Sequence, residues 1–393
     1  MAIRTFHLDN WLEPPHNRQA FQRIRELVPT APIRNRDGHR RELPVDLQPL
    51  DQVAMRGDVT GSTTWGEHLE RSMCDGVCVV HDGRIVFERY LNGMTADTAH
   101  LLMSVSKSVT GATLGISIGR GLLRADDLVT EIAPEFAGTS LDGATVQHVI
   151  DMTAGTDFVE DYDDYDDPNS TSPLVEYERQ AGYRRLMDRP LIGVYGHFRT
   201  YGTAFPHGSR FEYRSPLTNI AARLVEVVND MPFPAIVARD LWAPLGQEHD
   251  ADIMLDGLGA AIVEGGMSCS VRDLARFGLA YLDDGRVEGT QVIPADWVAD
   301  TCVATDESVR AFHAGSSGEA AWSHYRNAFW SMSRGEVFSG LGIFGQYCYV
   351  DRPSRTVIAR VSTYPSALPV ELSAETMAGF AAVVAATAGF AGR

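Results

Sequence analysis

Lysine is nearly absent from the sequence: the chain has 33 arginines but a single lysine, Lys107. The formal net charge is −18, and no basic stripe of the kind that binds phosphates is visible. We therefore exclude nucleic acid as a partner and expect no attraction to an anionic membrane surface. Arginine stays protonated at any ordinary pH, whereas a buried lysine can lose its proton and act as a base. The single retained amine is thus a candidate for proton-transfer chemistry.

Long apolar runs and a signal-like N-terminus are also lacking. The first residues, MAIRTFHLDNWLEPPHNRQAF, contain no basic region followed by an apolar stretch. No later segment approaches the roughly 20 uninterrupted apolar residues of a membrane span. These absences predict a cytoplasmic protein without a membrane partner.

Cysteine is scarce, and its spacing suggests no pairing. Five cysteines are an odd number, and they match no paired metal-ligand motif. We therefore expect no metal site and five buried free thiols, at Cys74, Cys78, Cys269, Cys302 and Cys348. The 393 residues, 44% of them hydrophobic, suffice for one large domain or two closely packed domains.

Strands are predicted early in the chain. The first 65 residues are rich in arginine and proline and predict an extended arm with one short helix near 17–27. Two β-rich runs, 76–81 and 84–90, then flank the dipeptide Asp82-Gly83. This arrangement is typical of a hairpin with a tight turn.

The middle and the end of the chain differ in their patterns. Amphipathic segments separated by glycine and proline predict a mainly helical middle, with helices at 146–151, 217–229 and 271–282. A second hairpin is predicted over 345–362, and an alanine-rich helix over 371–390. Strands near both ends of the chain predict one sheet assembled from distant segments, with the helical part inserted.

The only lysine lies on a predicted buried helix. Small and apolar residues at helical spacing begin at Ser104 and end at 119–121. Because residues i and i+3 share a helix face, the Ser104 hydroxyl and the Lys107 amine are expected to point the same way. With 24 serines in the chain, a lysine falls three residues after one by chance in roughly 6% of cases, so the pair alone is only suggestive.

Two well-known sequence motifs occur where the predicted secondary structure does not fit them. The segment 115–119 matches the nucleophile elbow G-x-S-x-G but lies inside the predicted helix, so Ser117 is expected to be a packed helix residue. The segment 340–345 matches G-x-G-x-x-G, but a strand follows it where a dinucleotide site needs a helix. Neither an α/β-hydrolase nor a Rossmann fold is predicted.

The segment 157–167 holds seven acidic residues in eleven positions, without the glycine and the distal glutamate of a calcium loop. The ordinary interpretation is a solvated surface loop. The alternative is a lid whose tyrosines and carboxylates face a pocket.

Tyrosines and histidines give weaker signals. Tyr213 is significant only beside a serine and a lysine that need a proton partner, because tyrosine rings usually pack in cores. The twelve histidines show no i, i+4 pairs, and we interpret each as structural. A Ser-His-Asp triad stays open, although nothing points to it.

Three segments, in the order Ser104-x-x-Lys107, Tyr213-x-Ser215 and Gly340-Leu341-Gly342, together resemble the serine β-lactamase and penicillin-binding protein superfamily. Further segments are similar to its 6-aminohexanoate-dimer hydrolase (nylon-oligomer hydrolase) and carboxylesterase branch: 10–18, 103–108, 265–267, 272–277 and 342–346. The resemblance spans nearly the whole chain.

The resemblance implies an α/β fold of the α+β type, in which helices flank an antiparallel sheet and a mainly helical domain is inserted. The α/β domain would comprise 1–100 and 268–393, and the helical domain 101–267. The active site would lie between them.

The resemblance also implies acyl transfer through a serine ester. Ser104 would be the nucleophile, and Lys107 and Tyr213 would share the proton transfers. The backbone N–H groups of Ser104 and Ile343 would form the oxyanion hole. No metal or cofactor is required.

Three positions depart from the superfamily pattern. Gly340 stands where β-lactamases and transpeptidases carry a lysine, which argues against β-lactam substrates. Arg214 follows Tyr213 where a small residue is expected, and it would either restore an anion site or face solvent. Glu264 stands where an uncharged polar residue is expected, which leaves the amide specificity open.

The leading hypothesis is a serine hydrolase of small-molecule esters and linear amides, with Tyr165, Glu264 and Phe344 as candidate substrate contacts. The alternative enzyme is a β-lactamase or D-amino-acid peptidase. The alternative of another class is a non-catalytic binding module with the same fold. A homodimer is a possible assembly.

Overall fold

The largest sheet combines strands from both ends of the chain. In the computed structural model, which describes residues 5–35, 38–165, 167, 169–316, 322–332 and 335–390, seven antiparallel strands follow the order β3-β2-β13-β12-β11-β10-β9. Strand β2, from the first hairpin, pairs with β13, from the second. The strands are β2 (Cys74–His81), β3 (Arg84–Tyr90), β9 (His324–Arg326), β10 (Phe329–Met332), β11 (Val337–Gly342), β12 (Gln346–Asp351) and β13 (Thr356–Ser362). The predicted assembly from distant segments is confirmed.

The first hairpin has the turn that its sequence predicts. Asp82 and Gly83 have φ values of 46° and 74°, the left-handed conformation that a two-residue turn requires between twisted strands. Most of the side chains on β2 and β13 are buried, because helices cover both faces of the sheet.

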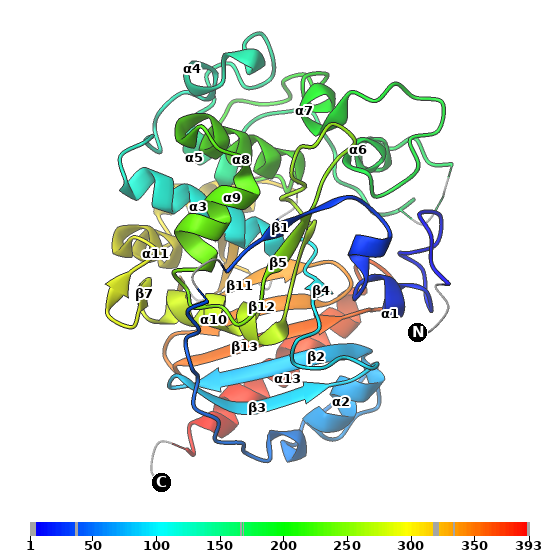
Figure 1. The fold of residues 1–393 in the computed structure, drawn as a ribbon, viewed down its shortest axis with the longest axis vertical. Helices are drawn as coiled ribbons and strands as arrows, with labels where there is room; N and C mark the ends of the chain where they lie inside the picture. Colours follow the sequence, from blue (N-terminus) through cyan, green and yellow to red (C-terminus); the bar gives the residue numbers. More distant parts are fainter. Residues whose placement is uncertain are drawn as a thin grey trace.

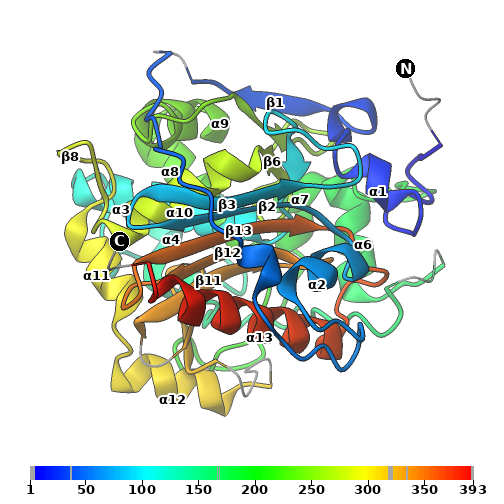
Figure 2. The ribbon, with the colours of Figure 1, turned by 90° about the horizontal axis from the view of Figure 1, so that it is seen from below.

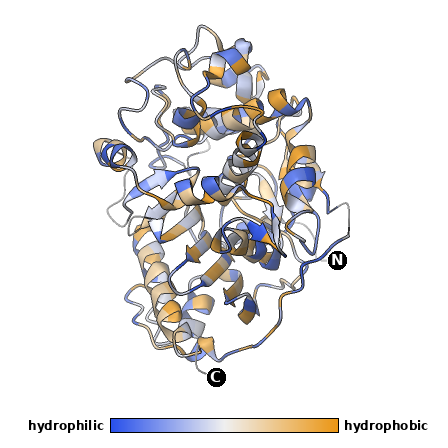
Figure 3. Cartoon of the chain, turned by 90° about the vertical axis from the view of Figure 1, so that its left-hand side faces the viewer, coloured by the Kyte–Doolittle hydropathy of each residue, from blue (hydrophilic) through white to orange (hydrophobic). Residues whose placement is uncertain are grey.

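Helices α2 (Trp65–Arg71) and α13 (Val370–Thr387) cover one face of this sheet, and α10 (Val271–Leu282) covers the other, as Figure 2 shows from below. By length and composition alone, α13 could cross a membrane, which qualifies the expectation that no segment approaches such a span. In Figure 3 this helix, next to the C-terminus, is coloured mostly as hydrophobic. Its residues Leu372, Phe380 and Val383 are buried in the core. A helix packed on a sheet needs such an apolar face.

The helical part of the chain lies above the sheet in Figure 1. Helix α3 (Val105–Gly119) is buried over most of its length and contacts both β11 and α8 (Pro216–Asn229). The other helical elements here are α4 (Val129–Ile132), η3 (Pro134–Phe136), α5 (Val146–Ile150), α6 (Pro173–Ala181), α7 (Gly193–Phe198), α9 (Phe233–Val237) and η4 (Ala238–Trp242). Elsewhere lie α1 (Asn17–Ala20), η1 (Ile24–Glu26), η2 (Leu50–Gln52), α11 (Ala295–Cys302) and α12 (Asp306–Ala314).

The G-x-S-x-G segment is helical, as predicted. Ser117 is buried within α3, and its hydroxyl donates a hydrogen bond to the carbonyl of Thr113, 3.2 Å away. The side-chain amide of Asn229, on α8, donates to the same hydroxyl. Ser117 therefore fastens two helices together and is not presented at a turn.

A second sheet was not predicted. It has four strands in the order β1-β5-β6-β4, namely β1 (Thr30–Ile33), β5 (Ala251–Met254), β6 (Met267–Cys269) and β4 (His100–Leu101). Strands of two to four residues show too little alternation to be recognised from sequence. The sheet joins the N-terminal arm to the middle of the chain, and it crosses the proposed domain boundaries at 100/101 and 267/268, so that division stays a prediction. A separate pair is formed by β7 (Arg286–Val287) and β8 (Thr290–Gln291).

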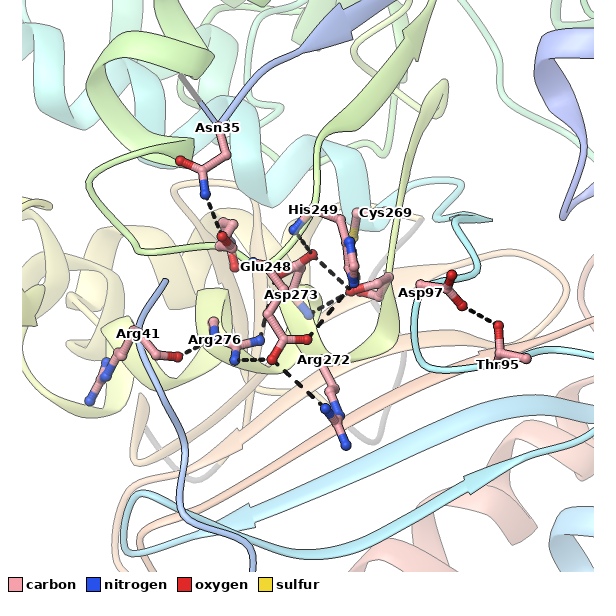
Figure 4. A network of polar contacts seen from close by, with 12 residues as sticks. Asn35, Arg41, Thr95, Asp97, Glu248, His249, Cys269, Arg272, Asp273 and Arg276 are labelled. Carbon is pink, nitrogen blue, oxygen red and sulfur yellow. Dashed lines mark hydrogen bonds and ion pairs between the residues drawn. The ribbon is translucent and has the colours of Figure 1, made fainter. Parts of the chain in front are cut away.

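Polar contacts fasten the N-terminal arm to the start of α10 (Figure 4). The carboxylate of Asp273 accepts hydrogen bonds from the backbone N–H groups of Glu248 and His249. The buried guanidinium of Arg276 donates to the carbonyl of Arg41 and pairs with Glu248. The segment 272–277, part of the family resemblance, is therefore structural.

All five cysteines are free thiols, as predicted. Four are buried and Cys302 is partly exposed. Within the described part of the chain, no group of histidine, cysteine, aspartate and glutamate side chains is arranged to hold a metal ion.

Candidate active site

Ser104 lies at the junction between β4 and α3. The residue before it, Met103, has φ of 46°, a conformation that is uncommon for a residue other than glycine. Such backbone strain persists only where the surrounding structure holds it, and it clusters at functional sites. Both neighbours of Ser104 are buried, whereas Ser104 itself is partly exposed. The sharp turn thus presents the hydroxyl at the N-terminus of a long buried helix.

Lys107 lies one helical turn after Ser104. Its Nζ is 2.6 Å from Ser104 Oγ and 2.6 Å from the backbone carbonyl oxygen of Glu264. Only 1% of the residue is exposed. Burial lowers the pKa of the Lys107 amine below that of an ordinary lysine, while the negative charges of Glu160 and Glu264 act in the opposite direction. The amine therefore has a neutral form within reach of the serine proton.

Tyr213 lies just before α8, and the structure places it beside this pair. Lys107 Nζ is 5.0 Å from the centre of the Tyr213 ring. The ring stacks on Trp330 with centroids 5.4 Å apart and meets Tyr325 edge-on at 6.0 Å. These aromatic contacts hold the ring in one orientation.

Strand β11 passes very close to the start of α3. A Cβ atom at Gly340 would lie 2.8 Å from Ser108 Oγ and 3.2 Å from a methyl carbon of Val105. A Cβ atom at Gly342 would lie 2.6 Å from the carbonyl oxygen of Leu102. The packing leaves no room for a lysine side chain at position 340, where the family resemblance leads one to expect it.

The third motif, Gly340-Leu341-Gly342, lies within β11, whereas the sequence predicted that a strand would follow it. Strand β11 is an interior strand of the sheet, because β10 pairs with one side of it and β12 with the other. Ile343 follows directly, where the chain leaves the strand, and its side chain is partly exposed.

A small pocket, open to solvent, lies at Ser104. Four tyrosines and three glutamates contribute to its wall, together with apolar and small residues. The lining residues are Met103, Ser104, Glu160, Tyr162, Tyr165, Leu174, Tyr177, Glu178, Tyr183, Ser215, Glu264, Gly265 and Ile343. The structure thus brings Tyr165, Glu264 and Ile343 to the cavity that contains Ser104.

Phe344 is not among the residues that line this pocket, so the structure does not bring it to Ser104 as the sequence analysis expected. Only 1% of the residue is exposed, and its ring packs edge-on against Phe21 with centroids 5.3 Å apart. Its φ of 61° turns the chain sharply after Ile343. The side chain therefore enters the core beneath the N-terminal arm.

Arg214 forms neither of the two expected arrangements. The residue is only 6% exposed, and its guanidinium lies 4.8 Å from the centre of the Phe205 ring. Burial lowers the pKa of Arg214 to about 10. It is absent from the cavity wall, so it provides no anion site beside Ser104.

The acidic segment reaches into the cavity. Glu160 accepts hydrogen bonds from the backbone N–H and the hydroxyl of Ser215, at 2.5 and 2.8 Å. Tyr162 donates to the same carboxylate at 2.8 Å. The exposed side chains of Asp161 and Asp163 fit the interpretation as a solvated loop, whereas Glu160 and the two tyrosines fit the alternative, a segment that covers the site. Asp166 lies outside the described residues.

Tyr165 is held in place by an ion pair. Its hydroxyl donates to Glu178 at 2.8 Å, and Arg184 donates to the other oxygen of that carboxylate at 2.6 Å. The Arg184 guanidinium also lies 4.7 Å from the centre of the Tyr165 ring. Sequence analysis missed Glu178, Tyr177 and Tyr183 because nothing in a short amphipathic helix and the turn after it shows which residues face a cavity.

Glu264 is the most unusual group in the cavity wall. The residue is 4% exposed, and its carboxylate lies beside the side chains of Asn219 and Tyr177 without a close hydrogen bond to a described residue. Burial raises the pKa of this carboxyl group well above that of an ordinary glutamate, while Lys107 and the nearby polar groups of Asn219 and Tyr177 oppose the shift. A buried carboxylate is costly unless its charge is compensated, and here Lys107, Asn219 and Tyr177 stabilise the charged form.

Comparison with known proteins identifies the family of this chain. Residues 67–377 match the family model described as Beta-lactamase. The chain belongs to the β-lactamase family. It is 35% identical over 367 residues to the 6-aminohexanoate-dimer hydrolase of Paenarthrobacter ureafaciens, covering 91% of this chain and 88% of that protein.

Solved structures show the same β-lactamase fold. A candidate 6-aminohexanoate-dimer hydrolase from Bacillus anthracis superposes with a TM-score of 0.88 at 22% identity, covering 99% of this chain and 98% of the other. A family VIII carboxylesterase superposes with a TM-score of 0.55 at 15% identity, covering 81% and 95%. The predicted α+β fold is confirmed, and the protein is a hydrolase of the β-lactamase family.

Proposed function

We propose that the protein hydrolyses esters and linear amides through an acyl-enzyme on Ser104. The observation that carries this proposal is the 2.6 Å contact between Ser104 Oγ and the buried amine of Lys107, at a pocket that Ser104 lines. An amine whose charged form is disfavoured by burial is suited to take a proton from serine.

In the proposed acylation step, the Oγ–carbon bond forms as the Ser104 proton passes to neutral Lys107. The backbone N–H groups of Ser104 and Ile343 stabilise the negative charge that develops on the carbonyl oxygen. The bond to the leaving group then breaks, and Lys107 and Tyr213 together return a proton to the departing oxygen or nitrogen. Water later hydrolyses the ester on Ser104.

The charge of the cavity supports a substrate class. Three glutamates and four tyrosines line it, and Arg184 already pairs with one of the glutamates. Negative charge and aromatic rings favour a positively charged group. We propose substrates that carry an amine, with ω-amino-acid oligomers as one class. Simple carboxylic esters should also react, because their better leaving groups tolerate imperfect proton delivery.

A β-lactamase or D-amino-acid peptidase is the second candidate, and hydrolysis of nitrocefin would favour it. The absence of a side chain at Gly340, where a lysine would hold a substrate carboxylate, argues against it. A non-catalytic binding module becomes the better interpretation if Lys107→Ala leaves every measured property unchanged.

The decisive variant is Ser104→Ala, compared with Ser117→Ala as a matched control in the same helix. We expect Ser104→Ala to abolish hydrolysis of p-nitrophenyl acetate and labelling by a fluorophosphonate probe, as measured by absorbance and intact mass. Ser117→Ala should retain both, because Ser117 only links α3 to α8. Equal rates for the wild type and Ser104→Ala would reject the assignment.

A further inference from the structure

One buried side chain, Gln346, holds the hairpin loop that carries Ile343. The loop comprises residues 343–345, because Gly342 pairs with Gln346 across it. The Gln346 residue is 0% exposed. Its side-chain nitrogen donates to the carbonyl oxygens of Ile343 and Ser362, at 3.2 and 2.7 Å, and its side-chain oxygen accepts from the Ser362 N–H at 3.0 Å. Both polar atoms of the side chain are thus hydrogen-bonded.

These contacts continue the sheet beyond its last backbone pair. The pairing of β12 with β13 ends at Tyr347 and Arg360. Beyond this pair, the Gln346 amide both donates to and accepts from the backbone of Ser362. An amide side chain offers the same donor and acceptor as a peptide group, so it can take the place of one in a strand ladder. The bond to Ile343 therefore joins the loop to the rigid sheet.

The other contacts of the loop fasten its middle and not Ile343. Phe344 and Gly345 have φ values of 61° and 87°, so the chain turns sharply here. The Phe344 N–H donates to the carbonyl of Ala367, and the Phe344 carbonyl accepts from the Tyr364 N–H. Among the described residues, the Ile343 carbonyl accepts a hydrogen bond from Gln346 alone.

The backbone of Ile343 has a donor to spare at the pocket. Ile343 and Ser104 both line the pocket. Neither of their backbone N–H groups donates a hydrogen bond to a described residue. Free N–H groups beside a nucleophile can bind the negative charge that develops on a carbonyl oxygen, provided that they point at it. The direction of the Ile343 N–H is therefore the property that matters for catalysis.

We propose that Gln346 is a positioning residue that directs the Ile343 N–H into the oxyanion hole. Its side chain fixes the carbonyl on one side of Ile343, and the pairing of Gly342 with Gln346 fixes the strand on the other. The Ile343 N–H lies between these two fixed points, so it keeps its direction as charge develops. The proposal rests on the proposed function, because an oxyanion forms only if Ser104 attacks a carbonyl group.

The test compares p-nitrophenyl acetate with its thiono analogue, in which sulfur replaces the carbonyl oxygen. Sulfur is a weak hydrogen-bond acceptor, so an oxyanion hole speeds the oxygen ester more than the sulfur ester. In Gln346→Met, kcat/KM for the oxygen ester should fall about 10- to 10²-fold, and the preference for oxygen over sulfur should fall at least about threefold. A merely structural role would slow both esters equally.

The control is Ser362→Ala, at the same end of β13. It removes the hydroxyl that accepts a hydrogen bond from the buried guanidinium of Arg360 at 2.9 Å, but it keeps the backbone groups that Gln346 contacts. It should lower stability without changing the preference for the oxygen ester. If Gln346→Met fails to fold, Gln346→Asn keeps the amide on a shorter side chain that cannot reach all its partners, and it should show a smaller loss of preference.

The proposal for Gln346 is overturned if its variants slow both esters equally, if they leave both rates unchanged, or if Ser362→Ala loses the preference to the same extent. Failure of the proposed function looks different, because Ser104→Ala would then still hydrolyse both esters.

Discussion

The chemistry of Lys107 depends on its position and not on its rarity. Its amine is buried between a serine hydroxyl and a backbone carbonyl, with a tyrosine ring beside it. An arginine at position 107 would stay protonated. A site that needs a neutral base therefore cannot use the residue that the rest of the chain prefers.

Lys107→Arg tests this requirement. We expect the rate of ester hydrolysis to fall by about 10²- to 10⁴-fold, because the guanidinium cannot accept the Ser104 proton. The burst and steady-state rates with p-nitrophenyl acetate measure the effect. Thermal unfolding and circular dichroism serve as controls for folding. Retention of more than a tenth of the activity would show that Lys107 is not the base.

The pH dependence of acylation should report the same amine. In the proposed mechanism neutral Lys107 is the active form, so the acylation rate should rise with pH through the lowered pKa of this lysine. The carboxylate of Glu160 favours the charged amine and so raises that pKa. Glu160→Gln should therefore move the acid limb of the burst rate to lower pH. A shift to higher pH would contradict this electrostatic account.

Among the secondary-structure elements, the close approach of β11 to the start of α3 does most to shape the site. Two glycines let the strand pass within contact distance of the helix start, so that Ile343 faces the cavity that contains Ser104. The same approach leaves no room for a lysine side chain at position 340. Packing between the two elements thus shapes this side of the candidate site.

Gly340→Ala tests this packing. The added methyl group would meet Ser108 Oγ and a methyl group of Val105, so we expect a loss of about 1–3 kcal/mol in the free energy of unfolding and a lower acylation rate. Urea denaturation and burst kinetics measure the two effects. Ser108→Ala removes the nearest clashing atom, so the double variant should recover part of both losses. Strict additivity of the two substitutions would contradict the proposed clash.

At the scale of the whole molecule, buried neutral histidines make stability depend on pH. Burial and the neighbouring arginines Arg360 and Arg326 lower the pKa values of His68 and His324, each to about 4. Below the usual histidine pKa of 6.5, these two side chains bind protons in the unfolded chain but stay neutral in the folded protein. The free energy of unfolding should therefore fall as the pH drops from about 6.5 to about 4.

For each histidine the loss over this window should reach up to about 3 kcal/mol. Urea denaturation of the wild type and of His324→Asn at several pH values measures it. The variant should show a smaller slope between pH 6.5 and 4, whatever its stability at pH 7. Identical slopes would show that His324 becomes protonated in the folded protein.

Much of the fold could be predicted because its elements carry local signals. The hairpin around Asp82-Gly83 and the buried helix that begins after Ser104 are confirmed by the structure. The four-stranded sheet was missed because strands such as His100–Leu101 are too short to show the alternation of apolar and polar residues that marks a strand. Cytoplasmic localisation and a homodimeric assembly stay predictions.

The sequence by itself determined the serine, the lysine and their shared helix face, because residues three apart on a helix are neighbours in every fold. It also carried the motifs that relate the chain to its family. Only the tertiary structure decided which side chains surround Ser104. Glu160, Glu178 and Glu264 come from distant segments, Phe344 turns into the core, and Arg214 stacks on Phe205. The packing of distant segments decides the cavity wall, and no local pattern encodes it.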